Sequence, residues 1–239
     1  MSPPPNFRPA LLVIDMQNDF CPGDPASRIP DGALAVAGGR DTIPSINALL
    51  SKPAFVYRAA TRDWHPQNHV SFAVNHGKKA FVDTTEVVHP DDPSKSYTTR
   101  LWPVHCIENT QGAQFVAGLD AFALDTVVDK GRDPRVEMYS ALHDPFHISD
   151  SGLVDAMREH AVTHVYVVGL AYDYCVKSTA LDARAARFDE EPAWEVLVIR
   201  EGTRAVDQTE ESLKAVEDEL RASGVWIVGM KDEEVGWLG

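Results

Sequence analysis

Three apolar runs in this chain lead into side chains that could take part in covalent chemistry. The run 11–14 precedes Asp15, the run 126–129 ends at Lys130, and the run 165–169 reaches Cys175 after a short turn. Continuous runs of Val, Ile and Leu are typical of parallel strands with both faces buried. The carboxyl ends of such strands lie at one edge of the sheet, where open α/β sheets bind their ligands. We therefore expect a carboxylate, an ammonium group and a thiol to meet there, a set suited to nucleophilic attack on an acyl carbon.

Cys175 is the expected nucleophile because the segment 169–175 leaves a strand and enters a helix. A thiolate at a helix N-terminus is stabilised by the helix dipole and by amide N–H groups, which could also receive the oxyanion of a tetrahedral intermediate. The alternative is a buried, inert cysteine, and this is our interpretation of Cys21 and Cys106. For Asp15 the alternative is a helix cap or turn residue, and for Lys130 a solvated strand end.

A second group of polar residues has the composition of a metal site. Asp63 and His65 follow the expected strand 54–60, and residues two apart on an extended chain point to the same side. His105 is a third candidate, and two imidazoles with one carboxylate are a ligand set of catalytic zinc and non-haem iron sites. The spacing alone is more typical of surface residues than of a metal site. His69 and His76 are interpreted as solvated loop residues.

The elements that must position these residues alternate between strands and helices. Such alternation predicts βαβ units, and hence a Rossmann-like, three-layer α/β/α fold around a mostly parallel, six-stranded sheet. The expected strands are 10–14, 54–60, 126–130, 164–169, 195–200 and 225–228, and the expected helices are 40–50, 152–160, 176–188 and 209–222. Residues 1–9 are expected to form a mobile lead-in to a single domain, 10–239. The polar stretch 67–103 breaks the alternation, and a loop of that length is expected to be functional or disordered.

The overall charge narrows the classes of partner. Asp and Glu total 36 against 22 for Lys and Arg, a net charge of -14, which argues against nucleic acid and anionic membranes as partners. No apolar run is long enough to span a bilayer. Three cysteines without framework spacing indicate reduced thiols, so we expect an intracellular protein, cytoplasmic with nuclear residence as an alternative. The sequence leaves self-association into a homo-oligomer open.

Five sequence blocks, in order, resemble one enzyme family. They are IDMQNDF at 14–20, RDWHP at 62–66, WPVHC at 102–106, DKG at 129–131 and YCV at 174–176. Together they are similar to the nicotinamidases among the isochorismatase-like cysteine hydrolases, the fungal members especially. The blocks span most of the chain, from about residue 10 to residue 228.

The resemblance implies roles for individual residues. It matches Asp15, Lys130 and Cys175 to a catalytic triad, and Asp63, His65 and His105 to the ligands of one divalent metal ion. Zinc is the expected ion, with iron or manganese as alternatives. It also matches Phe20, Trp102 and Tyr139 to the walls of a ring pocket, Ala171 and Cys175 to an oxyanion hole, and the bond between Leu170 and Ala171 to a cis peptide. His69 is left out, because its spacing from His65 differs from that of an extra ligand in some bacterial relatives.

The implied reaction is hydrolysis of nicotinamide to nicotinate and ammonia through a thioester on Cys175, as in salvage of NAD. Pyrazinamide is a second expected substrate. One alternative is a hydrolase of another small aryl amide, in which metal-bound hydroxide attacks and Cys175 takes no part. The other is an α/β module that binds a pyridine ligand without turnover.

Overall fold

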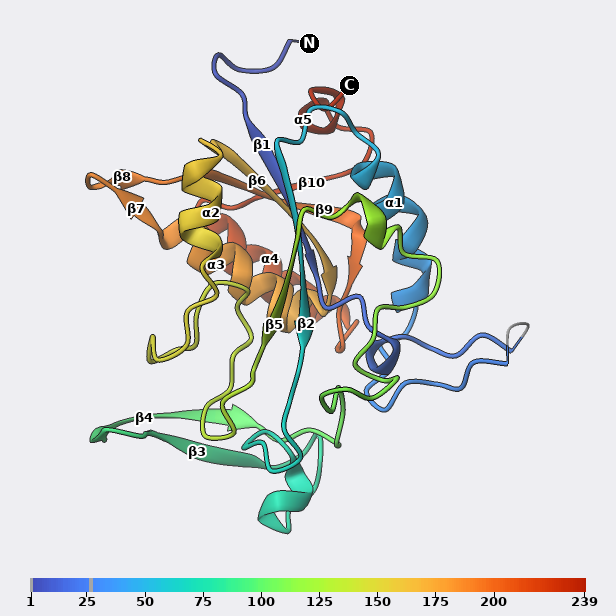
Figure 1. Cartoon of the computed structure of the whole chain (residues 1–239), viewed down its shortest axis with the longest axis vertical. Coiled ribbons are helices and arrows are strands. Elements are labelled where there is room, and N and C mark those ends of the chain that lie inside the picture. Colours follow the sequence, from blue (N-terminus) through green and yellow to red (C-terminus); the bar gives the residue numbers. More distant parts are fainter. Residues whose placement is uncertain (1, 26–27) are drawn as a thin grey trace.

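A six-stranded parallel sheet forms the centre of the protein, in a computed structural model that describes residues 2–25 and 28–239. The strand order is β10-β9-β6-β1-β2-β5. The strands are β1 (Pro9–Ile14), β2 (Tyr57–Asp63), β5 (Thr126–Lys130), β6 (His164–Leu170), β9 (Glu195–Arg204) and β10 (Trp226–Val228). All six expected strands are therefore confirmed, and their carboxyl ends lie at the lower edge of the sheet in Figure 1.

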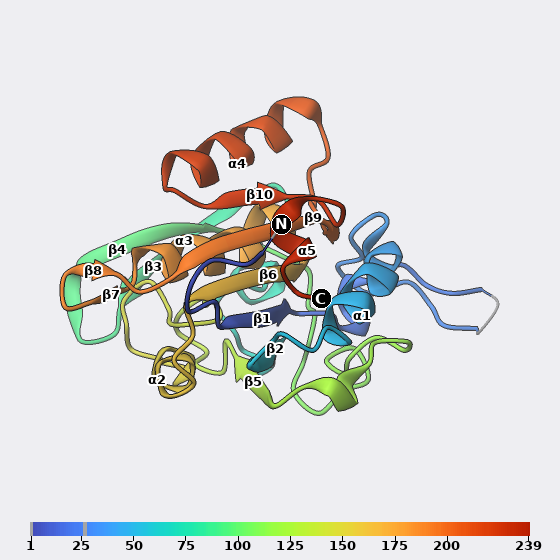
Figure 2. The ribbon, with the colours of Figure 1, turned by 90° about the horizontal axis from the view of Figure 1, so that it is seen from above.

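Helices cover both faces of the sheet, as expected for three layers. On one face lie α2 (Leu153–Glu159), α3 (Lys177–Ala185) and α4 (Glu210–Ala222), and on the other lie α1 (Ile43–Leu50) and α5 (Glu233–Gly236) (Figure 2). Alternate residues of one strand feed the two cores: Val165 and Val167 pack under α2, α3 and α4, whereas Tyr166 and Val168 pack under α1. This alternation follows from the two-residue period of a strand.

The remaining elements are short helical turns and a small hairpin. They account for several differences between the expected and the observed starts of helices. Single 3-10 turns cover Asn18–Phe20, Gly39–Thr42, Ala73–His76 and Ala121–Ala123, and a two-residue pair joins β7 (Arg187–Phe188) to β8 (Glu191–Pro192). The helix expected at 40–50 thus begins as a 3-10 turn, and the one expected at 176–188 begins as a π-helical turn, Tyr172–Val176. Helix α4 matches its prediction, because Thr209 caps its first turn by accepting from the Ser212 amide at 3.3 Å.

Strand β2 lies three residues further along the chain than the expected 54–60. The apolar start of that run, Ala54 to Val56, belongs to the connection from α1, and the strand continues through polar residues to Asp63. Asp63 is consequently the last residue of a strand, where sheet pairing fixes it, and it pairs in register with Lys130 on β5.

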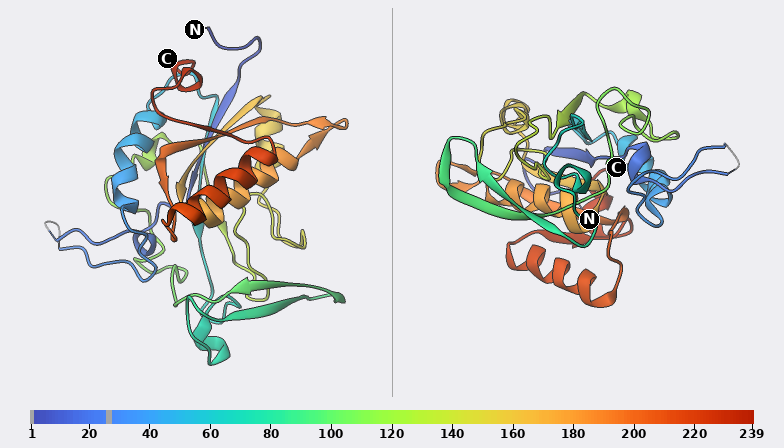
Figure 3. Two further views of the ribbon diagram at one scale, coloured as in Figure 1. Left: turned by 180° about the vertical axis from the view of Figure 1, so that it is seen from behind. Right: turned by 90° about the horizontal axis from the view of Figure 1, so that it is seen from below.

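The polar stretch 67–103 contains an antiparallel hairpin that the sequence analysis missed. It consists of β3 (Thr84–His89) and β4 (Asp92–Arg100), and it lies on the side where the parallel strands end (Figures 1 and 3). Only one residue of each strand is buried, Val87 and Thr99, so the hairpin lacks the apolar alternation that identifies a strand in sequence.

The N-terminal segment makes defined contacts before β1 begins. The ring of Phe7 packs edge-on against His164 at 4.8 Å, and the Arg8 guanidinium donates to the His160 carbonyl oxygen at 2.9 Å. Mobility of 1–9 and the single domain 10–239 stay predictions, and Met1 lies outside the described residues. Across the described chain, no helix combines the length and apolar character needed to cross a membrane.

Candidate active site

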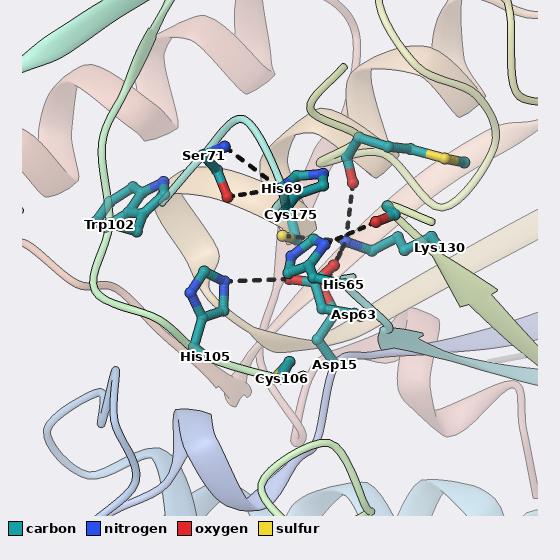
Figure 4. A network of polar contacts seen from close by, with 12 residues as sticks. Asp15, Asp63, His65, His69, Ser71, Trp102, His105, Cys106, Lys130 and Cys175 are labelled. Atoms are coloured by element: carbon teal, nitrogen blue, oxygen red, sulfur yellow. Dashed lines mark hydrogen bonds and ion pairs between the residues drawn. The ribbon is translucent and has the colours of Figure 1, made fainter. Parts of the chain in front are cut away.

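Lys130 lies at the centre of a buried polar cluster at the carboxyl ends of β1, β2 and β5. Its Nζ is 3.0 Å from Asp15 Oδ2, 2.5 Å from Asp63 Oδ1 and 3.5 Å from Cys175 Sγ, and it donates to the Met138 carbonyl oxygen at 3.0 Å (Figure 4). Lys130 is only 2% exposed. The three residues expected to meet as acid–base group, cation and nucleophile do meet in space.

Asp15 and Cys175 are also close to each other. A carboxylate oxygen of Asp15, one of Asp63 and the sulfur of Cys175 all lie within 4.8 Å of one another. Thr61 on the neighbouring strand β2 fixes Asp15: its hydroxyl donates to Asp15 Oδ1 at 2.6 Å and accepts from the Asp15 amide at 3.2 Å. Because the Thr61 hydroxyl engages Oδ1, the other carboxylate oxygen of Asp15, Oδ2, is the one that faces Lys130 and the Cys175 thiol.

Burial sets the protonation of the cluster. It raises the pKa of the Asp15 carboxyl to about 6, against the opposing attraction of Lys130. Burial likewise raises the pKa of the Cys175 thiol well above its ordinary value. For Lys130, burial lowers the pKa, but Asp15 and Asp63 outweigh it, so the pKa of the ammonium is raised. Near neutral pH the cluster therefore holds an ammonium group, a thiol and a carboxylate able to accept the thiol proton.

Asp63, His65 and His105 form a second group beside this cluster. Their ligand atoms lie within 4.8 Å of one another, with the Nε2 atoms of His65 and His105 at 3.5 and 3.9 Å from Asp63 Oδ2. Each Nδ1–H donates to a backbone carbonyl oxygen at 2.8 Å, of Gly131 for His65 and of Pro103 for His105. Since a carbonyl oxygen can only accept, each Nδ1 carries a proton, and in the neutral imidazole the lone pair is therefore on Nε2, which faces Asp63 in both residues. Burial lowers the pKa of His65, but the Asp63 carboxylate outweighs it, so the pKa of His65 is raised.

This donor set fits a divalent metal ion. Within the described chain, Nε2 of His65 is buried without a hydrogen-bond partner, as expected for an atom reserved for a ligand. Burial lowers the pKa of His105 to about 4, so this imidazole is neutral and free to coordinate. Backbone carbonyls that orient the opposite ring nitrogen are the usual second partners of metal-binding histidines.

Several supporting residues escaped the sequence analysis. The Gln17 side-chain amide donates to the Asp63 carbonyl oxygen at 2.8 Å and accepts from the Asp63 amide at 2.8 Å, fixing the backbone of this ligand. Asp19 Oδ2 accepts from the Cys106 amide at 2.6 Å and so orders the turn that carries His105. The sequence did hold a sign of these two residues, because polar side chains directly after a buried strand, such as Gln17 and Asp19, need buried hydrogen-bond partners.

His69 and the two remaining cysteines have surroundings that argue against a direct role. His69 is buried rather than solvated: its ring stacks on that of His65 at 4.0 Å, and its nitrogens contact the Ser71 hydroxyl at 2.8 Å and the Val136 carbonyl oxygen at 3.1 Å. The interpretation of His69 as a solvated loop residue is therefore wrong, because its ring packs against His65 and both of its nitrogens have buried partners. His76 is partly buried and contacts the Val70 carbonyl oxygen at 2.7 Å. Cys21 and Cys106 are buried free thiols whose pKa burial raises, as it does for Cys175, so their inert interpretation stays a prediction.

A small cavity opens onto both polar groups. It is lined by all three residues expected at the ring pocket and by the expected oxyanion residues: Phe20, Trp102, Tyr139, Ala171 and Cys175. Asp63 and His105 also line it, together with residues that the sequence analysis did not name: Leu34, Val36, Glu137, Tyr174 and Val206. The expected cis peptide between Leu170 and Ala171 is present at its edge. The oxyanion role itself stays a prediction.

Aromatic rings dominate one wall of this cavity. Trp102 lies edge-on to Tyr174 with ring centroids 4.8 Å apart, and Tyr174 lies 5.5 Å from Tyr139. Tyr174 could have been found from the sequence, because it directly precedes Cys175. Such a wall is suited to a flat, ring-shaped ligand whose substituent reaches the thiol.

Comparison with known proteins gives this geometry a context. Residues 9–232 match the isochorismatase domain. The chain is 38% identical to the nicotinamidase of Acinetobacter baylyi over 93% of each chain. Its fold is similar to that of the yeast nicotinamidase solved with the inhibitor nicotinaldehyde (TM-score 0.81, 32% identity, 92% of this chain and 99% of that one).

A second similar structure carries a metal. It is the pyrazinamidase of Pyrococcus horikoshii in complex with zinc (TM-score 0.66, 32% identity, 93% of this chain and 99% of that one). Bacterial, archaeal and yeast proteins thus match at similar identity, and the fungal likeness stays a prediction. Because the matched domain covers nearly the whole sequence, the chain belongs to the isochorismatase family.

Proposed function

We propose that this protein is a nicotinamidase, which hydrolyses nicotinamide to nicotinate and ammonia through a thioester on Cys175. The observation that carries the proposal is that Cys175, which lines an aromatic cavity, lies beside Asp15 and Lys130. The names of the similar proteins, nicotinamidases and a pyrazinamidase, support small aromatic amides as the substrate class. Nicotinamide is the proposed substrate and pyrazinamide a second one.

In the first half-reaction, Asp15 accepts the thiol proton of Cys175 and the sulfur attacks the carboxamide carbon. The new C–S bond places negative charge on the carboxamide oxygen, which the amides of Ala171 and Cys175 would receive. Asp15 then gives the proton to the carboxamide nitrogen, and the C–N bond breaks. Ammonia departs, and the acyl group stays on Cys175 as a thioester. Lys130 contacts both Asp15 and Cys175, so its charge stabilises the carboxylate and thiolate forms in turn.

In the second half-reaction, Asp15 accepts a proton from water, whose oxygen attacks the thioester carbon. The C–S bond then breaks, Asp15 returns its proton to the sulfur, and the nicotinic acid formed releases its own proton to solvent and leaves as nicotinate. The aromatic wall of Trp102, Tyr139 and Tyr174 keeps the ring in place through both steps, with Phe20 near His105 at the other side of the cavity.

We assign Asp63, His65 and His105 as the ligands of one divalent ion, with zinc as the proposed metal and iron or manganese as alternatives. When bound, the ion would anchor the pyridine nitrogen and withdraw electron density from the ring. The chain's own groups orient this site: the carbonyl oxygens of Gly131 and Pro103 fix the two imidazoles. The zinc-bound structure of the similar pyrazinamidase supports the proposal.

The test replaces the nucleophile. The Cys175→Ala variant is expected to lose all measurable ammonia release from nicotinamide while still binding metal, because the thiol is not a ligand. The Cys21→Ala variant, which removes a buried thiol elsewhere, serves as the control and should retain turnover. Mass spectrometry of quenched wild-type enzyme should show a nicotinoyl adduct on Cys175. Turnover by Cys175→Ala would instead favour hydroxide generated at the metal site, and no ammonia release by the wild type would favour a binding module.

Cytoplasmic residence, with the nucleus as an alternative, stays a prediction, as does assembly into a homo-oligomer. Neither enters the proposed reaction.

A further inference from the structure

The segment that carries Tyr139 has no regular structure of its own. Residues 131–140, which follow β5, form neither helix nor strand, yet Val136, Glu137 and Met138 are at most 3% exposed. A buried segment outside helices and strands needs partners for its backbone groups from elsewhere in the chain. Those partners fix where the aromatic wall lies.

The missed hairpin supplies the partners of Glu137, whereas the carbonyl oxygens of Met138 and Val136 contact Lys130 at 3.0 Å and His69 at 3.1 Å. On β4, the Tyr97 hydroxyl accepts from the Glu137 amide at 2.9 Å and donates to the Glu137 carbonyl oxygen at 3.3 Å. The chain that precedes the hairpin adds to this, since the Val70 amide donates to the Pro134 carbonyl oxygen at 2.8 Å. One tyrosine hydroxyl thus satisfies both backbone groups of a residue that lines the cavity.

A second contact controls the Tyr139 ring. The Trp102 Nε1–H donates to the Tyr139 hydroxyl oxygen at 2.9 Å, and the Thr99 hydroxyl lies 3.1 Å from the same oxygen. Because the indole nitrogen can only donate, the Tyr139 hydroxyl accepts there and makes its second hydrogen bond with Thr99. The hydroxyl is thereby engaged on both sides, which turns the ring of Tyr139 rather than its polar end toward a ligand.

Burial on β4 is confined to the residue that contacts Tyr139. Along β4, Thr99 is the buried residue, while its neighbours Thr98 and Arg100 are exposed. Burying a threonine hydroxyl is favourable only where it finds a hydrogen-bond partner, and this one finds Tyr139.

We propose that the hairpin β3–β4 sets the affinity of the pocket for the substrate ring, with Tyr97 and Thr99 as positioning residues that hold the segment from Glu137 to Tyr139. This inference rests on the proposed nicotinamidase activity, and it assigns a task to the polar stretch 67–103. The wall contacts the ring and not the reacting carbon, so its loss should weaken substrate binding more than it slows the chemical steps.

The test compares two threonines on one strand in the metal-loaded enzyme. Thr99→Val keeps the shape of the side chain and removes its hydroxyl, whereas Thr98→Val makes the same change on the exposed face. We expect Thr99→Val to raise KM for nicotinamide and pyrazinamide about fivefold, the size of one lost hydrogen bond, with kcat within about twofold. Thr98→Val and the hydroxyl-retaining Thr99→Ser should keep the wild-type KM.

A wild-type KM in Thr99→Val, or a fall in kcat at constant KM, would overturn the proposal, as would an equal effect of Thr98→Val. Should Thr99→Val fail to fold, Tyr97→Phe provides the same comparison, since it removes only the hydroxyl that holds Glu137. If the wild-type protein releases no ammonia from nicotinamide, the proposed function fails on its own. Crystal structures then decide this proposal: a displaced Tyr139 ring in Thr99→Val supports it, and an unmoved ring refutes it.

Discussion

The buried polar cluster of Asp15, Asp63 and Lys130, called the floor here, and the aromatic wall of the cavity are built in different ways. The floor residues Asp15, Asp63 and Lys130 end or directly follow three neighbouring parallel strands, and Asp63 and Lys130 are paired in register. The wall residue Tyr139 lies on an irregular segment that side-chain hydrogen bonds from the hairpin hold in place. Backbone pairing fixes the floor, whereas a few individual side chains fix the wall.

The difference has an energetic consequence. Two carboxylates and one ammonium group are buried together in the floor, and each depends on the others for its charge. Removing one partner from such a group leaves an uncompensated charge away from water. The wall holds neutral hydroxyl and indole groups, whose loss costs far less. Changes to the floor should therefore affect stability and rate together, and changes to the wall mainly substrate binding.

The largest effect is expected from Lys130→Met. It leaves Asp15 and Asp63 buried without their cation, so the free energy of unfolding of the metal-free protein at pH 7 should fall by about 3–5 kcal/mol. Lys95→Met is the control, because Lys95 pairs with Asp92 on the exposed hairpin at 3.3 Å and should change stability by less than about 1 kcal/mol. Urea unfolding of both variants provides the measurement. A loss below about 1 kcal/mol in Lys130→Met would contradict the role given to the floor.

The next largest effect, a tenfold to hundredfold loss of metal affinity, is expected at Gly131, where the floor meets the segment that carries Tyr139. Gly131 has a φ of +66°, and a Cβ there would lie 2.4 Å from Cε1 of His65. Gly131→Ala should push His65 aside and weaken metal binding about tenfold or more, as loss of an orienting contact does. Gly77→Ala has a matched backbone strain, at φ +61°, with no atom within 4 Å of the new Cβ. Metal titration should therefore separate the two variants, and equal affinities would show that the contact with His65 does not matter.

The smallest expected effect is a dependence of kcat/KM on pH, which arises from the Asp15 carboxyl in the floor. Burial raises the pKa of Asp15 to about 6, and Asp15 must be deprotonated to accept the thiol proton. As pH falls through about 6, Asp15 becomes protonated, so kcat/KM for nicotinamide should drop about tenfold per pH unit below that value and level off above it. Thr99→Val should show the same midpoint, because the wall does not touch this carboxyl. A midpoint near pH 4, the ordinary range of an aspartate, would argue against Asp15 as the base.

The floor could be predicted because its signals are local. Each of its residues follows an apolar run long enough to be a buried strand, and the topology of parallel sheets brings such strand ends together. The exact limits differed: β2 covers Tyr57–Asp63 and not 54–60, because residues 54–56 belong to the connection from α1 and the strand continues through polar residues. The metal ligands and the triad were in addition implied by the resemblance, and the structure places each set together.

The ring pocket could be predicted only as a set of aromatic residues. Phe20, Trp102 and Tyr139 do line the cavity, but Glu137 and Tyr174 were not expected there. The hairpin was missed because a strand with one buried residue has no periodic apolar signal. The contact between Thr99 and Tyr139 joins residues 40 positions apart, and nothing near either residue in the sequence indicates the other.

By itself, the sequence determined the sheet, its layers and the strand ends that carry Asp15, Asp63 and Lys130, because buried strands require apolar runs and parallel strands end at one edge. Only the tertiary structure decided the tautomers of His65 and His105, the inward position of His69 and the orientation of Tyr139. Those features depend on single hydrogen bonds between distant side chains and irregular backbone, and such bonds leave no periodic pattern in the order of the residues.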